Sequence, residues 1–313
     1  MRKIIFLLIT VFIVACEKDN NPGEITKPPA ALPNLPGKMI YHSYTSYSAN
    51  DSEVFLFDFA SKQVTCISKN WNIIAPMNAH FSPDGKQITF MGIHPPTDSW
   101  SVYIYELEGL QVPLRLSVGN YRDEDPKFSP DGKRITFKRN FQIAEMNLET
   151  GRITLLSPVG YAMPYYNFDG TKLTCTKDGW DSSIYLIDIQ TRALRVLYDN
   201  PEVQDYYSIG ADEKSFYYAT GYLPSNRIDQ IYRGYWSGLK SVRLPFNDTS
   251  GDYSDPYPVD DQWLLLSSSR TGSSGGYDLY IANAETGDIY SLTEYNPEIN
   301  TSREELGAAY FKN

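Results

Sequence analysis

The sequence predicts an all-β fold, a six-bladed β-propeller of four-stranded antiparallel blades that spans residues 38–313. Three observations predict it. One stretch of a dozen residues occurs twice almost unchanged, weaker copies of it recur along the chain, and each terminus holds part of one further unit. The composition agrees, because 42% hydrophobic residues and 25 tyrosines suit half-buried strands around a large core.

The repeated stretch reads "AHFSPDGKQITF" at residues 79–90 and "PKFSPDGKRITF" at residues 126–137. In SPDG, Pro suits the second position of a β-turn, Asp the third, and Gly accepts a positive φ at the end. Apolar residues alternate on both sides, which predicts a tight hairpin. Weaker copies continue the pattern, and the turn acids then lie 47, 38, 43 and 48 residues apart, at Asp84, Asp131, Asp169, Asp212 and Asp260.

Each copy is followed by a second pair of strands, as in "SVYIYELEGLQVPLRLS" and "DLYIANAETGDIYSLT". Four strands in about 40–45 residues are typical of one propeller blade. Residues 38–68 supply three strands of a blade without its innermost strand, and residues 306–311 supply one strand with nothing after it. We therefore expect the C-terminal strand to join the first blade, a closure that leaves no open sheet edge.

The N-terminal residues predict a lipoprotein. A short basic start precedes an apolar run, residues 4–14, that is shorter than the roughly 20 residues of a membrane-spanning helix. The sequence Ile13-Val14-Ala15-Cys16 resembles the bacterial lipobox, and this resemblance implies removal of residues 1–15 and acylation of Cys16. The Pro-rich residues 16–37 predict an extended tether.

Within the tether, "EKDNN" resembles the export tag of surface lipoproteins in Bacteroidota-type bacteria, although a solvated tether explains it equally well. We expect an outer membrane lipoprotein that faces the periplasm or the cell surface.

The repeat "FSPDGK" with "ITF", followed by "LY", "TG" and "LT", resembles the TolB-type propeller repeat family over residues 38–313. This resemblance implies the same blade architecture. TolB itself carries an additional N-terminal α/β domain, whereas here only the Pro-rich tether precedes the blades. That difference weakens the inference that this chain has TolB's own role at the cell envelope.

The residue types that carry catalysis are sparse. "GSSGG" at residues 272–276 matches the serine hydrolase pattern, but it lies between two strands and no His follows it. We expect only one of the three histidines, His42, His80 and His94, to lie within the pleat, which is too few for a metal site. Cys66 and Cys175 fall in blades one and four, too far apart for a disulfide, and both are predicted to be buried thiols. No cofactor is predicted.

Carboxylates mark one mouth of the predicted channel. "YRDEDP", "VQDYY" and "GDYSDP" each occur where a loop leads into an innermost strand. Two interpretations remain: the carboxylates converge on a cation or a basic peptide, or Asp before Pro satisfies backbone donors at the strand start. Nearby tyrosines suit a peptide or a sugar. The predicted ligand-binding residues are Asp123, Asp125, Tyr206, Asp252 and Asp255.

A formal net charge of −10 disfavours nucleic acid as a partner. The features together predict a monomeric, lipid-anchored and non-enzymatic scaffold that binds an envelope protein or peptide. Two alternatives stay open: a glycan-binding accessory protein, and a propeller-type polysaccharide lyase or hydrolase that uses the carboxylates and His80.

Overall fold

A computed structural model describes residues 31–109, 112–177, 183–199, 203–210, 214–222, 228–238 and 240–312. These residues form six four-stranded antiparallel sheets, together with two short 3-10 turns, η1 (Tyr47–Ala49) and η2 (Leu292–Glu294). From the innermost strand outward, blade one consists of β24 (Glu304–Phe311), β1 (Lys38–Tyr44), β2 (Glu53–Asp58) and β3 (Gln63–Cys66). Blade two consists of β4 (Ile74–Phe81), β5 (Gln87–His94), β6 (Ser99–Glu106) and β7 (Leu114–Arg115). Blade three consists of β8 (Asp123–Phe128), β9 (Arg134–Arg139), β10 (Gln142–Asn147) and β11 (Ile153–Leu155). Blade four consists of β12 (Tyr161–Tyr166), β13 (Lys172–Lys177), β14 (Ser183–Asp188) and β15 (Leu194–Asp199). Blade five consists of β16 (Val203–Gly210), β17 (Ser215–Tyr222), β18 (Asp229–Tyr235) and β19 (Val242–Arg243). Blade six consists of β20 (Tyr253–Pro258), β21 (Trp263–Ser268), β22 (Asp278–Asn283) and β23 (Ile289–Ser291).

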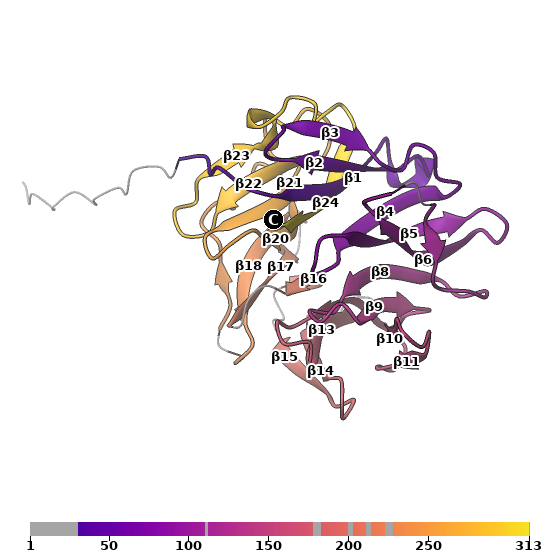
Figure 1. Cartoon of the computed structure of the whole chain (residues 1–313). Helices are drawn as coiled ribbons and strands as arrows, with labels where there is room; N and C mark the ends of the chain where they lie inside the picture. The colour runs from indigo at the N-terminus through magenta and orange to yellow at the C-terminus, as the bar shows by residue number, and fades with distance from the viewer. Residues whose placement is uncertain are drawn as a thin grey trace, which may run out of the picture.

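The innermost strands surround the middle of the molecule, and the outer strands, such as β3, β11 and β15, lie at its periphery (Figure 1). Around the ring β24 contacts β4, β4 contacts β8, and the contacts continue through β12, β16 and β20 back to β24. This closed order confirms the predicted six-bladed propeller.

The SPDG turns form through the side chains that the sequence repeats. Asp84 accepts hydrogen bonds from the Ser82 hydroxyl at 2.6 Å and from the Lys86 amide at 3.1 Å, and Gly85 has a φ of 68°. The turn of blade three repeats both contacts at Asp131, and in blade four the side-chain amide of Asn167 replaces the serine hydroxyl as a donor to Asp169. We call the end of the propeller that carries these turns the turn face, and the opposite end, where the innermost strands begin, the entrance face.

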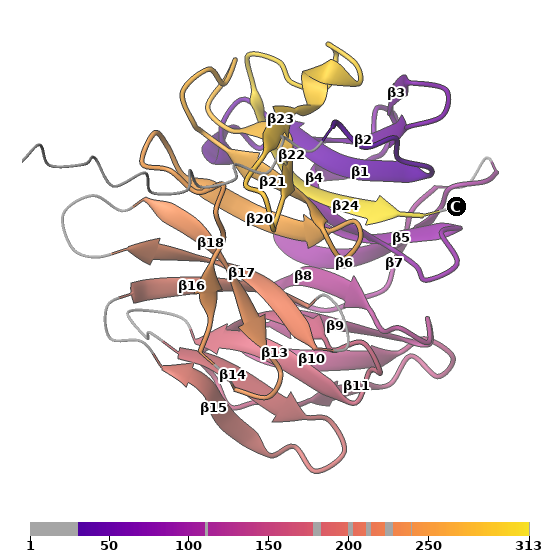
Figure 2. The ribbon, with the colours of Figure 1, turned by 90° about the vertical axis from the view of Figure 1, so that its left-hand side faces the viewer.

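The first blade combines both ends of the chain. Strand β24 pairs with β1 from Lys38 opposite Phe311 to Tyr44 opposite Glu304, and the two strands lie side by side in Figure 2. Beyond the strand, the guanidinium of Arg303 donates to the carbonyl oxygens of Ser43 at 3.0 Å and Asp51 at 2.8 Å. The predicted closure by the C-terminal strand is therefore confirmed.

Part of the predicted tether lies against the propeller. Leu35 is buried in the core that blades one and six share, and Leu32 packs on the same core. The hydroxyl of Tyr295 donates to the carbonyl oxygen of Pro33 at 2.5 Å. Residue 16 and the rest of the tether up to residue 30 lie outside the described residues. Within the described ranges, no helix is both long and apolar enough to cross a bilayer.

Both cysteines of the propeller are free thiols, in line with the predicted absence of a disulfide between them. Cys175 on β13 is fully buried, as predicted. Cys66 is only half-buried, because it ends β3, the outermost strand of its blade, where one side of the sheet faces solvent. The prediction of two buried thiols is thus wrong for Cys66.

Candidate functional site

A β-bulge interrupts every innermost strand near its beginning. In each of the six strands the pairing with the next strand shifts by one residue, for example between Glu124 and Lys127 in β8, and β4 has a second such shift. The residues of positive φ at these bulges are Ala75, Asn78, Asp125, Met163, Asp255 and Gly307. Asn, Asp and Gly tolerate this conformation better than other residues do, which explains four of the six.

The bulge decides which side chains face the channel. Before it, Glu124 faces inward; after it, Asp125 and Lys127 face inward, because the extra residue reverses the alternation of the strand. Phe128 points the other way, into the hydrophobic core around blade three. A sequence with strict period-two alternation would place Glu124 and Asp125 on opposite faces.

The inward-facing residues line a cavity of about 690 Å³. Its wall comes from the innermost strands β4, β8, β12, β20 and β24 and from segments that approach them at the entrance face, such as Tyr47, Arg122 and Tyr277. The cavity therefore lies at the end of the propeller opposite the SPDG turns. This volume is within the range of pockets that hold small ligands or a few side chains.

Three aromatic side chains form the floor of the cavity. His80 on β4 contacts Tyr165 on β12, with Nε2 and the hydroxyl oxygen 3.3 Å apart, and the ring of Tyr257 on β20 lies 6.2 Å from the imidazole. The hydroxyls of Tyr165 and Tyr257 are hydrogen-bonded to each other. Because the three strands belong to blades two, four and six, these side chains meet across the channel beneath the cavity.

His80 serves this floor as a neutral ring. Its Nδ1 accepts a hydrogen bond from the Phe128 amide at 3.3 Å, so Nε2 carries the proton and donates to Tyr165. Burial, and then the nearby ammonium of Lys127, lower the pKa of His80 to about 3. Both ring nitrogens are engaged, which leaves His80 unsuited to proton transfer or metal binding in this arrangement.

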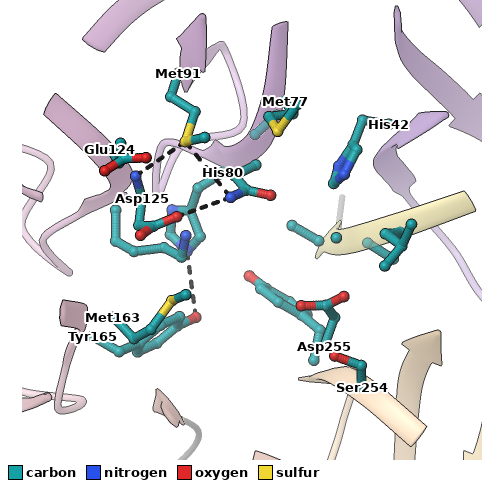
Figure 3. A pocket seen from close by; sticks show the side chains of 18 of the residues that line it. His42, Met77, His80, Met91, Glu124, Asp125, Met163, Tyr165, Ser254 and Asp255 are labelled. Atoms are coloured by element: carbon teal, nitrogen blue, oxygen red, sulfur yellow. Dashed lines mark hydrogen bonds between the residues drawn. The ribbon is translucent and has the colours of Figure 1, made fainter. Parts of the chain in front are cut away.

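Two carboxylates face each other across the cavity. Figure 3 shows Asp125 and Asp255 on opposite sides, and the Asn78 amide group donates to Asp125 at 2.9 Å. Asp255 accepts a hydrogen bond from the Gly307 amide. Burial raises the pKa of both carboxyls, and the charge of Lys127 opposes that rise.

Lys127 supplies a partly buried ammonium near both carboxylates. Burial lowers its pKa, whereas the charges of Asp125 and Asp255 act to raise it. Within the described residues its Nζ donates to the carbonyl oxygen of Pro126 at 3.3 Å. An ammonium has three N–H groups, so part of its hydrogen-bonding capacity faces the cavity.

The upper walls differ in charge. On blade three, Glu124 is paired with Arg122 at 2.8 Å and with Lys138 at 2.9 Å. Across the cavity, Asp252 precedes β20 and accepts from the Asp229 amide at 2.9 Å and from the Tyr277 hydroxyl at 3.3 Å. The wall of blade three therefore combines both signs of charge, and the wall of blades five and six presents carboxylates.

The cavity brings together three of the five predicted ligand-binding residues: Asp125, Asp252 and Asp255. Asp123 does not line it, because its carboxylate receives two hydrogen bonds from the Arg139 guanidinium, at 2.8 and 2.7 Å, within its own blade. Tyr206 lies on β16 opposite Thr220, and its side chain is outside the described part of the structure.

The expectation that only one histidine lies within the pleat is wrong. His42 is 4% exposed and His80 is 9% exposed, and both line the cavity. His42 sits on β1, the second strand of its blade, and reaches the channel because Gly307 beside it on β24 has no side chain. The position of His42 at the cavity depends on the pairing of β1 with β24, two strands that are far apart in the chain.

Lys127 and Tyr165 also line the cavity, although neither is among the residues predicted from the sequence. Each lies one position from a core residue, Phe128 and Tyr166, so alternation alone would have turned both toward the channel. Within the described ranges, no group of three or more His, Cys, Asp or Glu side chains could hold a metal ion. The arrangement is a polar, aromatic cavity that is closed below and open at the entrance face.

Comparison with known proteins supports the fold. The structure resembles TolB from Acinetobacter baumannii, with a TM-score of 0.69 and 17% identity over 90% of this chain and 68% of that one. It also resembles a putative TolB from Agrobacterium tumefaciens, with a TM-score of 0.58 and 15% identity over 88% of this chain and 99% of that one.

An oligogalacturonate lyase in complex with manganese is a further structural neighbour, with a TM-score of 0.52 and 18% identity over 82% of this chain and 74% of the lyase. No protein family model matches the sequence. No curated protein matches it either. The chain thus has a TolB-like six-bladed propeller fold, a fold that binding proteins and enzymes share.

Proposed function

We propose that this protein is a non-enzymatic scaffold of a bacterial cell envelope, anchored by a lipid on Cys16, that binds a segment of a partner protein in its cavity. The observation that carries the proposal is the cavity itself. It is closed below by His80, Tyr165 and Tyr257, and its rim at the entrance face holds the exposed ring of Tyr47. Exposed aromatic residues around a concave polar site are typical of protein-binding surfaces.

The structural neighbours support the same reading. TolB proteins from two bacteria share the fold over most of this chain. The engagement of both His80 nitrogens in the floor supports a binding role over proton transfer. The predicted lipid anchor would hold the propeller at the outer membrane, facing the periplasm or the cell surface.

A second candidate function is glycan binding or cleavage. The resemblance to oligogalacturonate lyase favours it, and the cavity carries carboxylates and tyrosines that suit a sugar. This candidate places Asp125 and Asp255 in contact with a sugar rather than with a peptide.

The test is chemical cross-linking in intact cells, followed by capture of the full-length protein through a C-terminal tag. A tag there leaves the cavity open, because β24 ends with Phe311 beside Gly85 at the turn face, opposite the cavity. One dominant envelope protein, lost when Asp125 and Asp255 are both changed to Asn, supports the proposal. Capture of no protein, together with turnover of an acidic oligosaccharide, would contradict it and favour the second candidate.

A further inference from the structure

The cavity distributes its charges unevenly. On the wall of blade three, carboxylates face cations of their own blade, as Glu124 faces Arg122 and Lys138. On the wall of blade six, Asp252 and Asp255 receive hydrogen bonds from neutral donors among the described residues: the amides of Asp229 and Gly307 and the hydroxyls of Tyr277 and Ser254. That wall therefore carries negative charge that no neighbouring side chain in the described part neutralises by direct contact.

An unpartnered polar side chain faces the same space. His42 is 4% exposed and lines the cavity, and its Nδ1 has no hydrogen-bond partner within the described residues. Figure 3 shows its ring directed into the cavity. Burial lowers the pKa of His42 to about 3, so the ring is neutral at pH 7 and one nitrogen is a hydrogen-bond acceptor.

Gly307 lets the ring of His42 pack against its backbone at this position. A Cβ built on Gly307 would lie 2.8 Å from Nδ1 and 2.7 Å from Cε1 of His42. The same glycine donates its amide to Asp255. A buried acceptor without a partner costs roughly 1–3 kcal/mol, which a ligand that donates a hydrogen bond would recover.

Aromatic rings lie at the same end of the cavity. Tyr44, Tyr47 and Tyr277 all line it, and the hydroxyl of Tyr277 is bonded to Asp252. Tyr47 is 53% exposed and stacks on Trp100, with ring centroids 6.4 Å apart. Rings of this kind attract organic cations through their faces, most strongly where water is excluded.

We propose that the cavity recognises a positively charged side chain, an arginine or a lysine of the bound segment, which donates to Asp252, Asp255 and His42 and lies against the tyrosines of the rim. This inference deepens the proposed function and rests on it. A small metal ion fits less well, because the described residues offer no group of three His, Cys, Asp or Glu close enough to share one. A guanidinium has five N–H donors in a plane and can reach acceptors that are farther apart.

Lys127 sets how deep the cation can lie. Its ammonium lies near Asp125, Asp255 and both histidines of the cavity, as the influence of its charge on their pKa values indicates. A second cation at the floor would be repelled by it. The ligand cation therefore belongs above Lys127, at the level of Asp252 and the rim tyrosines.

The test uses isothermal titration calorimetry on the full-length protein in detergent, with three peptides: acetyl-Gly-Tyr-Arg-Tyr-Gly-amide, the same peptide with citrulline for Arg, and the same with Glu. Citrulline keeps the shape of arginine and removes its charge. We expect the Arg peptide to bind at least about tenfold more tightly than the citrulline peptide, since each hydrogen bond to a charged group contributes roughly 1.5–3 kcal/mol. The Glu peptide should bind most weakly.

The variants Asp252→Asn and Asp255→Asn should each remove most of the Arg preference. His42→Leu should weaken binding of the Arg peptide a few-fold. Asp98→Asn is the matched control, because Asp98 is an exposed carboxylate on the same face but outside the cavity, and its loss changes the net charge equally. The Arg peptide should bind Asp98→Asn as it binds the unchanged protein.

Equal binding of the Arg and citrulline peptides, or binding of none of the three at millimolar concentration, would overturn the inference. The comparison between peptides needs no variant, so a variant that fails to fold leaves the test intact. Capture of a dominant partner in cells without any Arg preference in calorimetry would refute this inference alone. Failure of both experiments would refute the proposed function as well.

Discussion

Replacing Gly85 by Ala should destabilise the closure of the propeller. Gly85 ends the first SPDG turn with a φ of 68°, and a Cβ there would overlap the ring of Phe311, lying 2.5 Å from its Cδ1 atom. Phe311 is the last residue of β24, and its ring packs against Phe81 with centroids 5.9 Å apart. The substitution therefore acts on a turn of blade two and on the strand that closes blade one.

The magnitude has two parts. A non-glycine residue at positive φ costs roughly 1–2 kcal/mol, of which about 0.4–1 kcal/mol is offset because Ala restricts the unfolded chain. Displacing Phe311 adds a packing loss. Truncation of a fully buried Phe costs about 3–5 kcal/mol, and for this half-buried ring we expect about 1–2 kcal/mol. The free energy of unfolding should therefore fall by about 1–4 kcal/mol.

Gly151→Ala is the matched control. Gly151 has the same φ of 68°, and no atom lies within 4 Å of the position that its Cβ would take. The assay is urea-induced unfolding of the full-length protein, followed by tryptophan fluorescence. We expect Gly85→Ala to lose about 1–2 kcal/mol more than Gly151→Ala. Equal losses in the two variants would refute the argument that the turn of blade two supports the closing strand.

Three further predictions concern pH, the ammonium of Lys127 and the lipid anchor. Burial lowers the pKa of His80 from 6.5 to about 3, so between these pH values the unfolded chain binds a proton there that the folded chain does not. The free energy of unfolding should therefore fall as the pH drops from about 6.5 toward 3. His80→Phe should flatten this slope in unfolding curves measured between pH 7 and 4. Lys127→Met should raise the already raised pKa values of Asp125 and Asp255 further, because it removes the ammonium that favours their charged forms. The free energy of unfolding of the variant should therefore fall by about 1–3 kcal/mol at pH 7.5 and by much less at pH 5. An equal loss at both pH values would contradict the placement of the ammonium near the two carboxylates. Cys16→Ser should move the protein from the membrane fraction to the soluble fraction of lysed cells, whereas Cys66→Ser should leave it with the membranes; retention of both variants there would refute lipid anchoring through Cys16.

The fold could be predicted because its signal is repeated and local. Each of the two SPDG turns forms its own hairpin through contacts within six residues, such as those of Ser82 and Asp84, and weaker copies repeat the pattern along the sequence. The closure was predictable because residues 38–68 supply three strands and residues 306–311 supply one, which together make one four-stranded blade. None of this requires knowledge of how distant residues contact each other.

The cavity was only partly predictable. Asp123 and Asp125 are two residues apart and look equivalent in the sequence, yet the bulge turns Asp125 to the cavity and leaves Asp123 bound to Arg139. The position of a bulge depends on pairing between strands, which local sequence does not state. His42 likewise reaches the channel only because Gly307, 265 residues away, leaves room for it.

The central claim is that the cavity at the entrance face holds a segment of a partner protein. Site-specific photo-cross-linking tests it most directly, with a benzoylphenylalanine residue in place of Tyr47 at the cavity rim or in place of Phe168 at the turn face. Both side chains are about half exposed, at 53% and 46%, so the two probes are comparable in access. We predict a single cross-linked envelope protein from position 47 and none from position 168. Cross-links from position 168 alone, or the same products from both positions, would contradict the account.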